Sequence, residues 1–294
     1  MPPLSNTDIL FIINPFSGGP KKIDWQTLIR DYFKSHSFTI QFCILNGKDD
    51  EFSILQFIKK RVPQKIVAVG GDGTVSLVAK QLLGSSIPLG ILPAGSANGM
   101  ATNLKIPGDP LLAISTILTG RVQKCDVIKI NENDISIHLS DVGLNARVMK
   151  YFDKSATRGK WLYAIYFVRV LCQRKLFKVH ITGDNLDINI KAFMVVIANA
   201  RQYGTGAFID PEGIINDGKF ELVIVRRISF TEIFNLFFSH TPFNPKKIEI
   251  FQMTKATIII KRKTDFQIDG EYKGEINQVN AEILPSALNL IVPK

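Results

Sequence analysis

The feature that most constrains this 294-residue chain is a glycine-rich turn between a short apolar run and a helical pattern. The clearest example spans residues 65–77, K-I-V-A-V-G-G-D-G-T-V-S-L, where β-branched residues precede the turn. Its glycines let the backbone adopt positive φ and bring N–H groups close to an anion. Thr74 is placed to cap the following helix, whose N-terminal dipole favours the same anion. We therefore expect a strand, a phosphate-binding loop and a helix.

Asp72 adds a carboxylate to this loop, and a carboxylate repels phosphate unless a cation lies between them. The residue therefore favours a role with Mg2+, either directly or through water. The alternative is a plain strand-to-helix turn in which Asp72 is solvated, and a lone G-G-D-G does not decide between the two.

Two further glycine turns follow predicted strands in the first half of the chain. N-P-F-S-G-G-P, residues 14–20, follows a strand at 8–14, and P-A-G-S-A-N-G-M-A, residues 93–101, follows a strand at 88–92. The other predicted elements are helices at 23–36, 50–61 and 74–83 and strands at 38–45 and 65–69. This alternation predicts βαβ units on a parallel sheet, whose ligands bind beyond the carboxyl ends of the strands.

The pattern changes near Gly120, after which short strand-forming runs dominate. The predicted strands are 126–130, 135–139, 177–182, 186–190, 193–198, 220–225, 248–252, 257–261, 266–268 and 288–292, with helices at 147–152, 159–173 and 230–239. This spacing predicts a second domain that is an antiparallel β-sandwich or barrel-like. We expect an α/β domain at 1–122 and a sandwich at 123–287, and the last strand, 288–294, either stays with the sandwich or returns to the first domain.

The net charge of +10 predicts an anionic partner: a nucleotide, a nucleic acid or an anionic lipid surface. No nucleic-acid-binding module supports the second. Two stretches that mix basic and aromatic residues, 150–178 and 226–247, predict contact with an anionic membrane surface, and amphipathic helices packed on the sandwich are the alternative. We expect a cytoplasmic protein that is peripheral at the inner membrane surface. The three cysteines are scattered, the first apolar segment does not resemble a signal peptide, and the sequence has no long apolar run.

The chain resembles the diacylglycerol kinase catalytic family, in the family's motif order and over essentially its whole length. The resemblance rests on N-P-F-S-G at 14–18, G-G-D-G-T at 70–74, P-A-G-S-A-N-G-M-A at 93–101, Asp217-Gly218 and D-G-E at 269–271. It implies an ATP-binding α/β domain, a C-terminal β-sandwich and an active site in the cleft between them. It also implies transfer of the ATP γ-phosphoryl group to a lipid hydroxyl, with Mg2+.

The same resemblance assigns roles to individual residues. Nucleotide contacts are expected from Asn14, Pro15, Phe16, Ser17, Gly18, Gly71, Gly73, Thr74 and Ser96. Asp72 is expected near the transferred phosphate and Glu271 as the general base, a role that suits a carboxylate within reach of a hydroxyl. Asp217, helped by the backbone carbonyls of Ile214 and Lys219, is expected to hold a structural Mg2+. The alternative for both Asp217-Gly218 and D-G-E at 269–271 is a simple turn with no functional role.

Three positions depart from the family's pattern. Leu77 and Gly99 replace acidic residues of bacterial members, and Asn145 replaces an aspartate, so an amine-bearing acceptor such as sphingosine loses a counter-charge. The acceptor stays open among diacylglycerol-like, sphingoid and phosphatidylglycerol lipids, and a homodimer is compatible with the sequence. Two other functions remain: an NAD kinase-like enzyme, because that family shares G-G-D-G-T and a β-rich second domain, and a non-catalytic nucleotide- or lipid-binding module.

Overall fold

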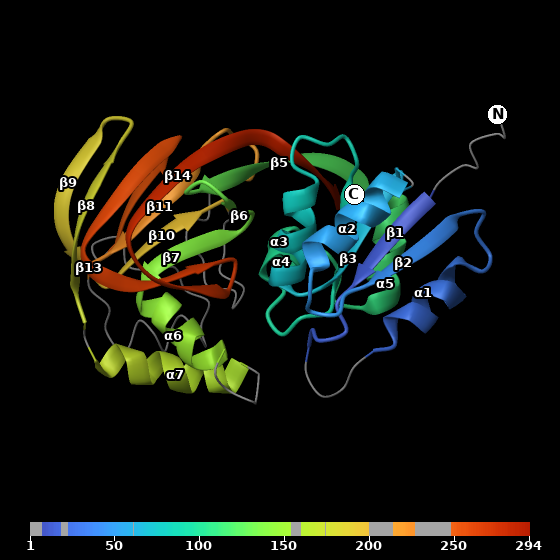
Figure 1. The fold of residues 1–294 in the computed structure, drawn as a ribbon, viewed down its shortest axis with the longest axis horizontal. Helices are drawn as coiled ribbons and strands as arrows, with labels where there is room; N and C mark the ends of the chain where they lie inside the picture. The colour runs from blue at the N-terminus through green and yellow to red at the C-terminus, as the bar shows by residue number, and fades with distance from the viewer. Residues whose placement is uncertain are drawn as a thin grey trace. The chain divides into compact units, whose positions relative to one another are not determined.

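The computed structural model describes residues 8–18, 23–60, 62–153, 160–173, 175–199, 214–226 and 248–294. The chain divides into two compact units, Met1–Cys125 with Ala287–Lys294, and Asp126–Ser286. Each unit has its own arrangement of strands and helices (Figure 1).

The first unit is built on a parallel sheet with helices on both faces. Its strands lie in the order β2 (Thr39–Ile44), β1 (Asp8–Ile13), β3 (Lys65–Gly70) and β4 (Leu89–Pro93). Helices α1 (Trp25–Phe33) and α5 (Pro110–Thr119) contact each other, as do α2 (Asp50–Lys60) and α3 (Asp72–Gln81) (Figure 1). Because the sheet is covered on both sides, the central strands are almost continuously apolar and buried.

The far end of the chain completes this first sheet. Strand β14 (Glu271–Val292) is 22 residues long, and Leu290 near its end pairs in parallel with Leu89 of β4. The Gly84 N–H donates to the Ala287 carbonyl at 3.0 Å, and Asn289 Nδ2 donates to the Ser85 carbonyl at 3.2 Å. One unit therefore combines segments from both ends of the sequence.

The second unit is an antiparallel β-sandwich. Its strands are the end of β5 (Arg121–Ile130), β6 (Asp134–Ser136), β7 (Leu139–Gly143), β8 (Phe177–Gly183), β9 (Leu186–Ala192), β10 (Met194–Ala198), β11 (Phe220–Val225), β12 (Ile248–Met253), β13 (Lys255–Ile268) and the start of β14. One path of pairing runs β12-β11-β10-β7-β13-β14, and β8 and β9 extend from β13. Buried apolar side chains from these strands, among them Phe220, Ile258 and Val279, form one core.

Helices α6 (Leu144–Asp153) and α7 (Lys160–Cys172) pack on the outer side of β7, β10 and β11. Val148 and Phe167 contribute to a second core there with Val196 and Val223. In the described part of the chain, no helix combines the length and apolarity that crossing a bilayer requires. The predicted fold class, a parallel α/β domain followed by an antiparallel sandwich, is confirmed.

Several predicted element bounds were wrong, each for a local reason. The strand predicted at 135–139 is broken at Ile137 and His138, because the Asp269 carboxylate accepts hydrogen bonds from both of their N–H groups at 3.0 Å. The strands predicted at 257–261 and 266–268 are one strand, β13, with a register shift between Ile259 and Thr264.

Helix starts also differ from expectation. Helix α3 begins at Asp72 with Gly71 as its N-cap, so Thr74 lies inside the helix and does not cap it. Helix α5 was not predicted, although Asp109 caps it by accepting from the Leu112 N–H at 3.0 Å and Pro110 opens it. The helix predicted at 230–239 lies outside the described residues.

Candidate active site

The loops that follow β1 and β3 meet through hydrogen bonds between their side chains. Asn14, directly after β1, donates from Nδ2 to Thr74 Oγ1 at 2.9 Å, and Ser17 Oγ lies 3.5 Å from the same hydroxyl. Asn14 Oδ1 accepts from the Phe16 N–H at 2.9 Å and so fixes the turn. The structure thus brings together three residues predicted from the sequence, Asn14, Ser17 and Thr74.

The loops that follow β3 and β4 touch backbone to backbone. A Cβ added to Gly95 would lie 2.4 Å from the Gly71 Cα, closer than atoms can approach. Gly18 has φ +84°, and a Cβ there would lie 2.7 Å from the Ala94 carbonyl oxygen. Glycine is therefore required at these contacts, because any side chain would force the loop backbones apart.

Asp72 holds the third loop in place. Its Oδ2 accepts from the Gly99 N–H at 2.8 Å and its Oδ1 from the Met100 N–H at 2.9 Å, at the start of α4 (Gly99–Asn103). Asn98 directly precedes α4, but its side chain bonds Gly95 and does not cap the helix. Asp72 supplies this cap instead. Its expected role near the transferred phosphate stays a prediction.

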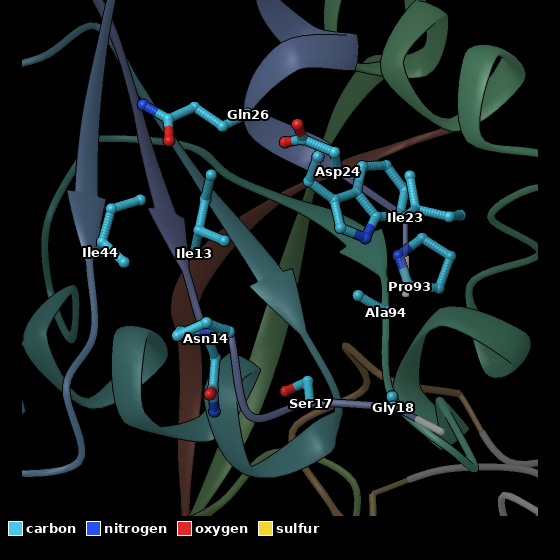
Figure 2. A pocket seen from close by; sticks show the side chains of 13 residues that line it. Ile13, Asn14, Ser17, Gly18, Ile23, Asp24, Gln26, Ile44, Pro93 and Ala94 are labelled. Carbon is cyan, nitrogen blue, oxygen red and sulfur yellow. The ribbon is translucent and has the colours of Figure 1, made fainter. Parts of the chain in front are cut away.

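A cavity of about 390 Å³ opens beside these loops in the first unit (Figure 2). Asn14, Pro15, Ser17 and Gly18, all predicted from the sequence, line it together with Pro93, Ala94 and Gly95. Ile13 and Ile44 lie on one side of this view, and Ile23, Asp24, Pro93 and Ala94 lie on the other (Figure 2). Apolar walls beside polar loop groups suit a ligand with a flat base and a charged tail.

The remaining predicted nucleotide residues do not line this cavity. Phe16 is 67% exposed and Ser96 is exposed on the loop after β4, while Gly71, Gly73 and Thr74 form the start of α3. Sequence reasoning missed the lining residues at the start of α1 and the end of β2, namely Ile23, Asp24, Trp25, Gln26 and Ile44. Asp24 is the N-cap of α1, and its bonds from Thr27 lower the pKa of the Asp24 carboxyl.

In the second unit, Glu271 lies just after a turn that a buried carboxylate anchors. Asp269 Oδ1 accepts from Ser136 Oγ at 2.8 Å and from the His138 and Leu139 N–H groups at 3.0 Å. Its Oδ2 accepts from the Ile137 N–H at 3.0 Å. Glu271 itself begins β14 with its side chain 55% exposed, and its Oε2 accepts from Lys273 Nζ at 3.2 Å.

A second buried carboxylate, Asp141, supports the same turn through Gln267. Asp141 accepts from the Gln267 and Asn145 side-chain amides and from the Ala146 N–H, and Gln267 Oε1 accepts from the Gly270 N–H at 2.7 Å. Burial raises the pKa of Asp141 to about 6, although these three donors favour the ionised form. The carboxylate that Asn145 lacks is thus present nearby on Asp141, but Asp141 is fully buried.

The residues predicted to hold a structural metal ion lie on an exposed turn. Asp217 Oδ1 accepts from the Lys219 N–H at 3.0 Å, and Ile214 is exposed. Sequence reasoning missed Asp126, a buried residue whose carboxylate accepts from the Gly218 N–H at 2.7 Å and from the Ser286 N–H at 2.6 Å. Within the described ranges, no group of three or more His, Cys, Asp or Glu side chains could hold a metal ion.

Comparisons with known proteins match both units. Residues 8–130 match the diacylglycerol kinase catalytic domain, and residues 139–292 match the YegS C-terminal NAD kinase beta sandwich-like domain. The chain is 31% identical to the "Probable lipid kinase YegS-like" of Klebsiella pneumoniae, over 78% of each chain. It is 28% identical to the "Probable lipid kinase YegS" of Escherichia coli O9:H4, over 88% of each.

A solved structure also shares the fold. A diacylglycerol kinase from Bacillus anthracis superposes with a TM-score of 0.69 over 97% of both chains, at 18% sequence identity. At that identity the similarity supports the fold alone.

Proposed function

Because the chain belongs to the YegS-like lipid kinase family and carries its diacylglycerol kinase catalytic domain, we propose that it transfers the γ-phosphoryl group of ATP to a lipid hydroxyl. The hydroxyl oxygen attacks the γ-phosphorus, the bond between this phosphorus and the bridging oxygen breaks, and ADP leaves. Glu271 takes the proton of the hydroxyl. The products are a lipid phosphate and ADP.

The observation that carries this proposal is the convergence of the loops after β1, β3 and β4. Asn14, Ser17 and Thr74 are in contact, and Gly71 packs on Gly95 with no side chain between them. Phosphoryl transfer depends mainly on positioning and on charge neutralisation, which backbone N–H groups at helix starts can supply. The base of ATP fits the apolar part of the adjoining cavity, beside Ile13 and Ile44.

Mg2+ is the cation that the family's chemistry implies. Bound to the phosphates, it would neutralise their charge, and Asp72 is the acidic residue that the glycine loops supply. A structural Mg2+ would be held by Asp217 and the carbonyls of Ile214 and Lys219, since the turn offers hard oxygen ligands. Asp126 would support that turn through Gly218.

For the lipid acceptor, the polar groups near Asn145 favour an alcohol that carries no amine, such as diacylglycerol or phosphatidylglycerol. The Asp141 carboxylate is buried and occupied by three donors, so it is not available to pair with a sphingoid amine. A lipid acceptor also requires contact with a membrane, and α7 presents exposed Ile165 and Val168 beside Arg169. The side chains of Trp161 and Tyr163, and most of the stretch 226–247, lie outside the described residues.

Turnover of radiolabelled ATP with diacylglycerol, phosphatidylglycerol, sphingosine and NAD as separate acceptors tests the proposal. We expect labelled lipid phosphate with the wild-type chain and at least a 100-fold lower kcat, about 2.7 kcal/mol, for Glu271→Gln. ATP affinity should stay within about twofold, because Glu271 is not part of the nucleotide loops. Glu282→Gln, an exposed change on the same strand, is the matched control and should keep full activity.

The C-terminal match to an NAD kinase-like sandwich supports a second candidate, phosphorylation of NAD. Turnover of NAD with none of the lipids would select it. ATP binding with no phosphorylation of any acceptor would instead identify a nucleotide-binding module, the function that the replacements at Leu77 and Gly99 suggest.

A further inference from the structure

Three lysines lie in one row across neighbouring strands of the sandwich. Lys191 of β9 pairs directly with Lys178 of β8. Val179 pairs with Ile260 of β13, so the next position of this antiparallel ladder brings Lys261 opposite Lys178. All three side chains are exposed, and they line a shallow hollow of about 490 Å³ together with His180, Asn189 and Ile259.

The charges of this lysine row are not balanced within the described part of the chain. On the outer face of β8, β9 and β13, Asp187 lies four residue pairs away from the row and bonds His180 Nε2 at 2.7 Å. Lys255 faces Glu282 at 4.0 Å toward the opposite end of β13. Like charges placed directly opposite each other destabilise a sheet, so the row is unfavourable for folding alone.

Protection of a sheet edge explains only part of the row. Lysines on edge strands prevent pairing with other chains, and β9 is such an edge, because in the described structure it pairs with β8 alone. Lys178 and Lys261 have no such role, since β8 lies between β9 and β13, and β13 lies between β8 and β14. Their placement points to an anionic partner.

The composition of this face selects among anionic partners. Its outward residues on β8, β9 and β13 include no Phe, Tyr or Trp, the side chains on which single-stranded nucleic acid stacks. It does include Ile259, which is 44% exposed beside the lysine row. A row of lysines with an exposed aliphatic side chain suits the headgroup region of an anionic bilayer, where each lysine adds to the attraction.

We propose that the outer face of β8, β9 and β13, with the row Lys178, Lys191 and Lys261, docks the protein on anionic phospholipid headgroups. The choice of a membrane rests on the lipid kinase function proposed above, because the acceptor lipid resides in a bilayer. The face provides a contact with the membrane that is separate from the residues that bind nucleotide or take the proton.

Co-sedimentation of the full chain with vesicles tests this directly and needs no ATP. We expect binding to mixed phosphatidylcholine and phosphatidylglycerol vesicles and little binding to phosphatidylcholine alone. The triple variant K178Q/K191Q/K261Q should bind the mixed vesicles about 100-fold more weakly. The triple variant K48Q/K59Q/K129Q removes the same net charge at other exposed lysines and should lose no more than about threefold.

Two further measurements keep the result unambiguous. The row variant should unfold at the wild-type temperature or above it, because it removes like-charge contacts, so a loss of binding cannot come from misfolding. Equal weakening of vesicle binding in both triple variants would overturn the proposal. So would a row variant that loses binding to a single-stranded oligonucleotide but binds vesicles as the wild type does. A chain that docks through the row but phosphorylates no lipid would overturn the kinase proposal alone.

Discussion

The Gly70–Thr74 loop of the first unit and the Asp269–Glu271 turn of the second each carry a candidate catalytic carboxylate, but different groups hold them in place. The glycine loop is fixed by an amide that bonds a hydroxyl at 2.9 Å, by one glycine packed on another, and by two N–H bonds that its own half-buried Asp72 accepts. The Asp269–Glu271 turn is fixed by two buried carboxylates, one of which accepts four hydrogen bonds.

The carboxylates of these two regions differ in burial and in hydrogen bonding, and therefore in the roles that they can have. Asp269 and Asp141 are buried and fully engaged, and therefore maintain geometry, whereas Glu271 is exposed and bonds only Lys273 among the described residues. Asp72 lies between these extremes, because it is half-buried and caps α4. A carboxylate that must accept a proton needs access to its substrate, and of these four Glu271 has the most.

The largest effect is expected from Asp269→Ala, which leaves three backbone N–H groups and a hydroxyl without their acceptor. We expect a loss of about 4 kcal/mol in the free energy of unfolding, measured with urea. Asp269→Asn should cost less, because its Oδ1 can keep the bonds from Ser136, His138 and Leu139. The exposed change Asp134→Asn is the control, and equal losses in all three variants would contradict the anchoring role.

Asp141→Asn tests the second carboxylate through pH. The folded pKa of Asp141, about 6, lies above the usual value of 3.8, so the folded state holds a proton that the unfolded state has released. Stability should therefore fall as pH rises between about 4 and 6, by about 3 kcal/mol from this group. Asp141→Asn should remove that fall. A pH profile identical to the wild type would show that the three donors keep Asp141 ionised throughout.

Gly95→Ala tests the close contact of the glycine loops. The added Cβ would collide with the Gly71 Cα, so the loops after β3 and β4 must separate. We expect a loss of about 2 kcal/mol in stability and at least tenfold weaker ATP binding, measured by calorimetry. Gly108→Ala is the matched control, since nothing lies within 4 Å of its Cβ position. Unchanged ATP affinity in Gly95→Ala would show that the contact between Gly95 and Gly71 does not matter for binding.

The smallest effect is expected from Asn14→Ala, which removes one side-chain bond to Thr74 and one to the Phe16 N–H. The Phe16 N–H is exposed and can bond water instead, and the buried Thr74 hydroxyl still has Ser17 Oγ at 3.5 Å, so stability should fall by only about 1 kcal/mol. Asn46→Ala, an exposed asparagine that also bonds a backbone N–H two residues later, is the control in the same urea unfolding assay. A loss as large as that of Asp269→Ala would erase the contrast between the two regions.

The same contrast explains what the sequence could predict. The parallel sheet and the three loops depend on local patterns, strand then glycine turn then helix, and these were found with bounds close to those observed. The bonds from Gln267 to Asp141 and from Ser136 to Asp269 join residues 126 and 133 positions apart. No local pattern reports such pairs, so the supports of the Asp269–Glu271 turn and the cap supplied by Asp72 required the structure.

Strand β14 has a consequence for how the protein is made. Leu290 leaves the ribosome long after Leu89, yet Leu290 pairs with Leu89 of β4 in the parallel sheet of the first unit. During synthesis this edge of the sheet stays unpaired until the second unit has emerged, which exposes it to premature association. A chain truncated before Ala287 would therefore keep the whole second unit but lose the segment that pairs with β4, and separate expression of residues 1–125 should give an aggregation-prone product.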